Sequence, residues 1–531
     1  MNQAELIKKQ IVTCSNILCA IVLLSFSKQV GSNAMAYLGV ALLSVHLFLL
    51  FCYHGVADMI GRMIRGKKSK GFYKDAVQVR KRVMFLQALT GFVLMAVCFL
   101  IAPFLCDKVF MIPYGLIPLQ ILSVMVFLHS LEAMFGGYFQ SVGSFLPEAI
   151  GNVLRILFTL VFGKLFAGKM SYTGERVSAL LMNDDFAGMY GAIGLSIGFV
   201  IAETLVVIFY LFLYLISDKV GERKRAASGH QKTESMQDTC RYYYSTLITI
   251  AVTNLLLYMP MFALFFFQGR KTENIYSNAY LMGELVGRLF PVAVLFVLLF
   301  ALRIHILLTK MGAHVRKQEY RVVAEYIGAG IHYTWCMGVY VCVMLLALSE
   351  YFTFAFFADA TRIHSVMPIF GLFVFAFVLF FFVVSVFAAL KEHILLFIGG
   401  GLCAVISILY YALAGKGADL CKQAMFDAIF AMLLVGIIGA ALLVWKYQVR
   451  IDYVRVFVIP LFSVALTGLL CIFLAKLLTP HMGNAASFVL CSACGLVVHV
   501  SLLSVTKSVQ DTEVSCLYGN FGKKILGLIF R

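Results

Sequence analysis

The residues whose types and spacing allow chemistry lie inside segments that are otherwise apolar. Glu148, Asn152, Arg155 and Thr159 follow one another at steps of four, three and four residues. On a helix this spacing places all four side chains in one narrow polar stripe. A guanidinium group in such a stripe can hold phosphate or carboxylate oxygens by charge-assisted hydrogen bonds. The stripe therefore favours a wet, anion-binding interior, and a buried Glu148–Arg155 pair that only fixes helix packing is the alternative.

A second polar set repeats this pattern later in the chain. Ser277, Glu284 and Arg288 lie on one helical face, and Glu four residues before Arg is the favourable order for a helical ion pair. Glu203 is a further acid in an apolar run. The alternative is that Glu284 and Arg288 neutralise each other and bind nothing. The candidate substrate-binding residues are Glu148, Asn152, Arg155, Glu203, Glu284 and Arg288.

Two further groups of charged residues lie at the edges of apolar runs. Asp58 and Arg62 are candidate residues of an intracellular gate, although a solvated helix end is the interpretation that their position favours. Asp184 and Asp185 lie in the predicted external loop 168–186, where paired acids can hold a metal ion and a phosphosugar or are simply solvated. No helix carries histidines at ligand spacing. The sequence therefore predicts no metal site and no catalytic residues.

The composition indicates which solvent surrounds these residues. Of the 531 residues, 62% are hydrophobic and only 13% are charged, which is about half the charged share of a typical soluble domain. A soluble protein of this length could not cover so much apolar surface, and a disordered chain would be poor in apolar residues. The sequence thus excludes a water-soluble enzyme and predicts a chain that is mostly surrounded by lipid.

Apolar runs long enough to cross a membrane follow one another along the chain. A helix needs about 20 apolar residues to cross the hydrocarbon core. We predict an all-α polytopic membrane protein with about fourteen transmembrane helices. These spans cover residues 11–27, 34–60, 83–106, 113–135, 147–167, 187–216, 243–268, 275–308, 323–349, 364–389, 392–413, 424–445, 456–478 and 486–507.

Basic residues in the connecting segments orient these spans. The net charge is +17. With the N-terminus inside, the cytoplasmic segments hold most of the Lys and Arg residues, as the positive-inside rule requires. An even number of spans then places the C-terminus inside as well. The basic charge therefore indicates orientation and not nucleic-acid binding. The chain also contains no P-loop, so transport would run without its own nucleotide hydrolysis.

The most polar segment of the chain, 217–242, separates six predicted spans from eight. We predict a six-helix N-terminal lobe at 1–216, a basic cytoplasmic linker at 217–242, and a six-helix C-terminal lobe at 243–445. Two additional helices and a cytoplasmic tail occupy 446–531. Two lobes that surround a central cavity are one common transporter plan.

A local motif resembles a known group of transporters. The segment Gly136–Gln140 reads Gly-Gly-Tyr-Phe-Gln, and Pro147–Ile150 and Arg155 follow it at matching positions. This region resembles the fourth-to-fifth helix region of the stage V sporulation protein B and polysaccharide-exporter group. That group belongs to the multidrug/oligosaccharidyl-lipid/polysaccharide exporter superfamily, which also contains lipid II flippases. The resemblance covers about 80 residues including the Gly/Ala-rich segment 190–203, whereas Gly55–Ala57 departs from the family's Gly-x-Pro pattern.

The resemblance implies a flippase that moves a polyprenyl-linked saccharide or a peptidoglycan precursor by alternating access. Arg155 and Arg288 would bind the pyrophosphate, while Glu148, Glu203 and Glu284 would neutralise the empty site or take part in ion coupling. The implied partners are the lipid-linked glycan, membrane lipids and cell-envelope assembly proteins. The implied location is the plasma membrane, here a bacterial inner membrane. No cofactor is expected, and coupling would be to a Na⁺ gradient, a H⁺ gradient or the membrane potential.

Two other functions stay open at this point. One is a cation-coupled exporter of drugs or small metabolites with the same fold, which a buried acid without a nearby Arg would favour. Glu203 is the candidate for that acid. The other is a membrane-embedded glycosyltransferase-type enzyme that uses Asp184 and Asp185.

Overall fold

The computed structural model describes residues 3–217, 234–266, 280, 283–357, 361–364, 366–413, 420–510, 512–514, 516 and 517. These residues form helices and no strands, which confirms the all-α prediction. Ser277, most of the linker and the end of the tail lie outside the described residues. The number of fourteen spans and the cytoplasmic location of both termini stay predictions.

Eleven helical segments among the described residues are long and apolar enough to cross a membrane, and a shorter apolar helix covers Gln10–Val22. Large apolar side chains cover their outer faces, for example Leu100 at 75% exposure and Phe462 at 68%. A soluble protein would not present such surfaces to water, whereas lipid tails solvate them. The chain is therefore a multi-pass membrane protein.

The chain divides into two compact units. The N-terminal unit comprises Ile7–Tyr258 and Glu273–Arg288, and the C-terminal unit comprises Met1–Leu6, Met259–Thr272 and Leu289–Arg531. The segment that carries Glu284 and Arg288 thus packs with the N-terminal helices, although its position in the chain predicts the second lobe. The lobe boundaries at 216 and 243 stay a prediction.

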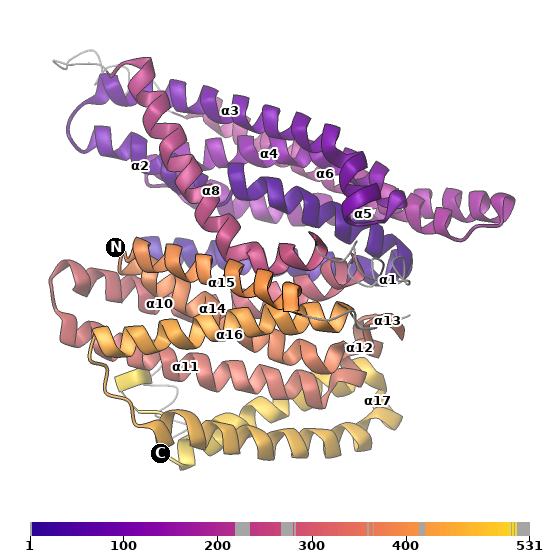
Figure 1. Cartoon of the computed structure of the whole chain (residues 1–531), viewed down its shortest axis with the longest axis vertical. Helices are drawn as coiled ribbons and strands as arrows, with labels where there is room; N and C mark the ends of the chain where they lie inside the picture. The colour runs from indigo at the N-terminus through magenta and orange to yellow at the C-terminus, as the bar shows by residue number, and fades with distance from the viewer. Residues whose placement is uncertain are drawn as a thin grey trace. The chain divides into compact units, whose positions relative to one another are not determined.

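Seven helices build most of the N-terminal unit, and α3 to α6 lie side by side within it (Figure 1). In chain order they are α1 (Gln3–Cys52), α2 (Val56–Lys68), α3 (Tyr73–Phe104), α4 (Leu116–Ser141), α5 (Leu146–Leu181), α6 (Asp185–Ile216) and α8 (Met236–Phe266). Short π and 3₁₀ turns at Leu105–Val109 and Pro113–Gly115 connect α3 to α4.

Glycines set the register of the α5–α6 hairpin. A Cβ atom on Gly198 would lie 2.7 Å from Cα of Gly163, and one on Gly194 would lie 2.5 Å from the carbonyl oxygen of Phe166. The G-x-x-x-G step at Gly194 and Gly198 therefore brings the two backbones into direct contact, as its small residues predict. Because the helices of a hairpin are antiparallel, this contact places the residues two turns before Gly163 opposite those just after Gly198.

A second glycine contact joins α1 to the segment before α10. A Cβ on Gly39 would lie 1.8 Å from the carbonyl oxygen of Gly283, and one on Gly283 would lie 2.2 Å from that of Ala36. A Cβ on Gly287 would lie 2.6 Å from the carbonyl oxygen of Met35. Three glycines thus let two backbones touch where any side chain would hold them apart. A π-helical turn, Leu285–Leu289, follows directly and contains Arg288.

Two glycines bend the longest helices. Gly31 in α1 has φ 76° and ψ 172°, and Gly483 in α17 (Ile459–Val505) has φ 76° and ψ 170°. This backbone region is open almost only to glycine. Each bend separates two of the predicted spans, 11–27 from 34–60 and 456–478 from 486–507.

A buried polar junction links four helices of the N-terminal unit. The Gln87 amide on α3 donates to the Cys52 carbonyl oxygen at 2.7 Å and to Ser130 Oγ on α4 at 2.8 Å. Its Oε1 accepts from the Tyr243 hydroxyl on α8 at 2.5 Å. Gln87 is fully buried, so these bonds satisfy an amide that would otherwise be costly in the membrane. The junction fixes α4, the helix that carries the buried acid Glu132.

The C-terminal unit is built around α14 (Met367–Ala389), which packs against α10, α11, α15 and α16 (Figure 1). Since α14 is apolar on every side, it is suited to the middle of a helical bundle. The remaining elements are α10 (Phe290–Arg316), α11 (Tyr320–Ala347), α12 (Ser349–Phe356), α13 (Thr361–His364), α15 (His393–Leu413), α16 (Leu420–Lys446), a π turn at Val454–Val458, and α17.

Candidate functional site

Arg155 on α5 is the centre of a buried charged cluster. Its Nε donates to Glu203 Oε2 on α6 at 2.7 Å, and its Nη2 lies 3.2 Å from Glu203 Oε1. The same Nη2 lies 2.7 Å from Glu132 Oε1 on α4. The Glu203 side chain is 1% exposed, that of Glu132 6% and that of Arg155 18%. One guanidinium thus joins three helices, because the glycine contact of the hairpin places Arg155 opposite Glu203.

Asn152 extends this cluster towards α1. Arg155 Nη1 donates to Asn152 Oδ1 at 2.5 Å. The Asn152 amide in turn donates to Ser15 Oγ at 3.0 Å and to Asn16 Oδ1 at 2.8 Å. These bonds fill the donors and acceptors of a side chain that is 3% exposed. The polar stripe of α5 therefore faces α1, α4 and α6, while Leu157 and Val161 on the same helix are more than half exposed.

His129 lies beside the two acids of the cluster. One ligand atom each from His129, Glu132 and Glu203 lies within 4.8 Å of the others. His129 Nδ1 is 2.9 Å from the Met125 carbonyl oxygen, and since a carbonyl only accepts, Nδ1 is the donor of this hydrogen bond. Glu132 Oε2 is buried and has no hydrogen-bond partner among the described residues. The cluster holds two carboxyl groups and one guanidinium, so a proton or a small cation bound there would balance the second carboxylate charge.

Glu284 and Arg288 form a second buried pair in the same unit. Arg288 Nη1 donates to Glu284 Oε1 at 2.5 Å and to Ser32 Oγ on α1 at 3.2 Å. Both charged side chains are 0% exposed. The π turn and the three glycines hold Arg288 against α1. Its complete burial means that a ligand reaches this pair only if the surrounding helices move.

The structure thus brings Arg155, Asn152 and Glu203 together in one cluster, and Glu284 with Arg288 in another. Glu148 is half-buried near the beginning of α5, about two turns before Arg155. A single cavity lined by all six candidate residues stays a prediction.

The candidate gate residues interact along one helix. Asp58 Oδ2 lies 3.2 Å from Arg62 Nε, and both side chains are more than half exposed. An exposed pair at this spacing contributes little to stability, so its role as a gate stays a prediction.

Asp185, the second of the paired acids, makes structural hydrogen bonds. Asp185 Oδ1 accepts from the Tyr37 hydroxyl at 2.9 Å and from the Tyr280 hydroxyl at 3.2 Å. Asp184 directly precedes α6. Within the described part of the chain, the ligand atoms that lie close enough together to share a metal ion belong to His129, Glu132 and Glu203. Asp185 therefore ties α6 to α1.

Sequence reasoning missed three residues of interest. Glu132 and His129 lie in the predicted span 113–135, where their ionisable type alone was a signal. Asp427 lies in the predicted span 424–445 and is 0% exposed on α16. It has no salt bridge among the described residues, and Ser407 on α15 is its polar neighbour. None of the three belongs to a row of polar residues at helical spacing, which is the pattern that indicates candidates in the sequence.

No protein-family model matches this chain, and no curated protein matches its sequence. Solved structures of transporters match its fold. Lipid II flippase MurJ in an inward closed conformation has a TM-score of 0.63 and 15% identity, covering 94% of this chain and 98% of the flippase.

Two MATE transporters match as well. An inward-facing MATE family transporter of the MOP superfamily has a TM-score of 0.60 and 12% identity, covering 82% of this chain and 94% of that one. A eukaryotic MATE transporter has a TM-score of 0.53 and 14% identity, covering 87% and 98%. The chain has the fold of these transporters. The fold implied by the sequence resemblance is thereby confirmed.

Proposed function

We propose that this protein is a flippase that moves a polyprenyl-linked saccharide or a peptidoglycan precursor across a bacterial inner membrane by alternating access. The observation that supports this proposal is the structural match to a lipid II flippase, which covers 94% of this chain and 98% of the flippase. Such a cargo has an anionic pyrophosphate and polar sugars that need a polar path, while its lipid tail stays in the bilayer. Its translocation breaks no covalent bond, so the protein acts without catalytic residues.

The Arg155 cluster is proposed to receive the anionic part of the cargo. Arg155 is held by two carboxylates, so phosphate oxygens would compete with Glu132 and Glu203 for its five donors. Exchange of a carboxylate for a phosphate keeps the guanidinium hydrogen-bonded throughout. The displaced carboxylate then needs a proton or a cation, which would couple cargo binding to an ion. Glu148, Glu284 and Arg288 are proposed to line the path. Asp58 and Arg62 are proposed to form the gate at its cytoplasmic end.

The test is a flipping assay in phosphatidylcholine proteoliposomes. A fluorescent polyprenyl-pyrophosphate-linked saccharide should become accessible to an impermeant quencher faster than in protein-free vesicles. The same lipid without its pyrophosphate and sugar should gain nothing from the protein. Equal rates with and without the protein, for every saccharide tried, would contradict the proposed function.

The Glu284–Arg288 pair can be removed without leaving either charge unpaired. We expect Glu284→Ala/Arg288→Ala to lower the flipping rate at least about tenfold, because one phosphate-binding guanidinium is lost. The matched control is Glu175→Ala/Arg176→Ala, which removes an exposed acid and an exposed base. If both double variants flip at the parental rate, the pair only fixes packing and has no role in the path.

A cation-coupled exporter of drugs or small metabolites is the second candidate, and Asp427 favours it. This acid is fully buried on α16 and forms no salt bridge among the described residues. A buried carboxyl group in such surroundings requires a proton or a small cation for neutrality. It meets the criterion of a buried acid without a nearby Arg better than Glu203, which is paired with Arg155.

Asp427→Asn tests this second candidate. The variant should transport at a rate that no longer responds to an imposed Na⁺ or pH gradient, because the neutral amide cannot exchange a proton or pair with a cation. The measurement is the rate of transport in proteoliposomes with and without each gradient. The control is Asp452→Asn, an exposed residue between α16 and α17. An unchanged gradient dependence in Asp427→Asn would exclude coupling through this acid.

A further inference from the structure

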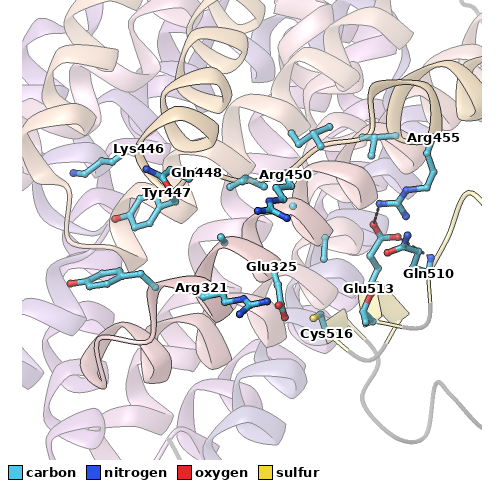
Figure 2. A pocket seen from close by; sticks show the side chains of 18 of the residues that line it. Arg321, Glu325, Lys446, Tyr447, Gln448, Arg450, Arg455, Gln510, Glu513 and Cys516 are labelled. Carbon is cyan, nitrogen blue, oxygen red and sulfur yellow. Dashed lines mark hydrogen bonds and ion pairs between the residues drawn. The ribbon is translucent and has the colours of Figure 1, made fainter.

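A cavity of about 1220 Å³ lies wholly within the C-terminal unit (Figure 2). One wall comes from the first turns of α11, and a second from the segment that connects α16 to α17. The third wall is formed by residues that follow α17, including Gln510 and Glu513. None of its lining residues belongs to the Arg155 cluster or to the Glu284–Arg288 pair. The proposed transport path therefore leaves this cavity unexplained.

Two of the basic residues around the cavity are neutralised by acids of its own wall. Lys446 pairs with Glu392. Arg455 Nη2 lies 2.9 Å from Glu513 Oε1, and Arg455 Nη1 donates to the Ser508 carbonyl oxygen at 3.0 Å. These contacts hold the segment after α17 against the π turn and keep the wall in place.

Glu513 is itself fixed from two sides. Its Oε2 lies 3.0 Å from His332 Nδ1 on α11, opposite the contact with Arg455. Burial by itself would raise the pKa of the Glu513 carboxyl, but the hydrogen bonds from His332 and Arg455 hold the pKa below its ordinary value. Glu513 therefore stays ionised and cancels the charge of Arg455.

Two guanidinium groups of the cavity have no acidic partner among the described residues. Arg321 on α11 and Arg450 in the α16–α17 connection are exposed and form no ion pair among the described residues. Figure 2 shows both side chains at the cavity, from opposite walls, with Glu325 as the remaining acid beside Arg321. Two guanidiniums against one carboxylate leave an excess positive charge. A planar guanidinium binds phosphate oxygens in pairs, so these two groups offer donors to a phosphate that enters the cavity.

Aromatic residues indicate the depth of the cavity in the membrane. Trp445 is 79% exposed and Tyr453 is 68% exposed, and both stand at the end of α16 or just beyond it. Tyr320 and Tyr447 line the cavity itself, with ring centroids 6.4 Å apart. Exposed Trp and Tyr side chains gather at the level of the lipid headgroups. The cavity thus lies where headgroup phosphates are, on the side that the basic segments predict to be cytoplasmic.

We propose that this cavity is a binding site for the phosphate of an anionic lipid headgroup, gripped by Arg321 and Arg450. A free phosphate ion has the same anionic chemistry, but the headgroup-level position and the aromatic rim favour the lipid. Bound there, the lipid would join α11 to the α16–α17 connection.

Native mass spectrometry of the full chain in detergent tests this site. Phosphatidylglycerol should bind, and phosphatidylcholine should bind at least about tenfold more weakly because its headgroup carries no net charge. Arg321→Gln/Arg450→Gln should weaken phosphatidylglycerol binding by about tenfold or more. The matched control, Arg316→Gln/Lys507→Gln, removes the same net charge from exposed residues that do not line the cavity.

The outcomes separate the site from general charge and the lipid from free phosphate. Equal losses in both double variants, or no loss in either, would overturn the site. Displacement of the lipid by millimolar inorganic phosphate would overturn the lipid as the occupant. Arg321→Lys/Arg450→Lys, which keeps the charge but not the paired geometry, should fall between the wild type and the Gln variant. The thermal midpoint in phosphatidylcholine alone checks that each variant is folded. Flipping in phosphatidylcholine vesicles is measured separately, so failure here leaves the transport proposal standing.

Discussion

Arg155→Met is expected to lower the free energy of unfolding by about 3–5 kcal/mol, because it leaves Glu132 and Glu203 as unpaired carboxylates in a buried site. Both acids are nearly inaccessible, with side-chain exposures of 6% and 1%. Removal of the guanidinium also takes the partner from Asn152 Oδ1, 2.5 Å away. Transport of the lipid-linked saccharide should stop in the same variant. Unfolding is measured by thermal or denaturant melting of the purified protein in detergent.

A compensated variant separates stability from function. Arg155→Met/Glu132→Gln/Glu203→Gln removes all three charges and keeps polar groups of similar size, so most of the lost stability should return. Its flipping rate should nevertheless stay near that of protein-free vesicles, because the central cluster then has no guanidinium to receive the phosphate and Arg288 is fully buried. Recovery of both stability and flipping would show that the cluster only holds α4, α5 and α6 together. The exposed Arg176→Met serves as the control for the type of substitution.

Gly39→Ala is expected to destabilise the N-terminal unit by about 1–3 kcal/mol or more, as overpacking does. The added Cβ would lie 1.8 Å from the Gly283 carbonyl oxygen. Since this neighbour is backbone, it cannot swing aside, and the segment Gly283–Arg288 must move away from α1. The hydrogen bond between Arg288 and Ser32 at 3.2 Å should then lengthen or break. The measurements are the thermal midpoint and the flipping rate.

Gly312→Ala is the matched control for that variant. Gly312 lies inside α10, and an added Cβ would meet nothing within 4 Å. Alanine should therefore raise stability there by about 0.5–1 kcal/mol through its better helix propensity. If Gly39→Ala is as stable as the wild type, the close approach of the two backbones is not needed for the fold.

The membrane-spanning nature of the chain could be predicted from composition because lipid selects for long apolar helices whatever their neighbours are. The stripe of Asn152 and Arg155 was equally visible, since helical periodicity is a local property. The G-x-x-x-G step at Gly194 and Gly198, which brings α6 against α5, is likewise a local feature of the sequence. Each of these features depends on residues within one helix.

The partners of the charged residues could not be predicted in the same way. The sequence offered Glu148 as a partner of Arg155, two turns earlier on the same helix face, whereas the structure shows Glu132 and Glu203 from two other helices. Asp427 gave no periodic signal at all, and its isolation is evident only once α15 and α16 are packed together.

The sequence by itself determined that this is an all-helical membrane protein with a few buried charges, because burial in lipid is decided helix by helix. Only the tertiary structure decided which of those charges meet. It placed Glu284 and Arg288 with the N-terminal helices, held there by glycine contacts between backbones far apart in the chain. It also assembled the basic cavity of the C-terminal unit from three separate segments. Contacts of this kind depend on the register of packed helices, which no single stretch of sequence specifies.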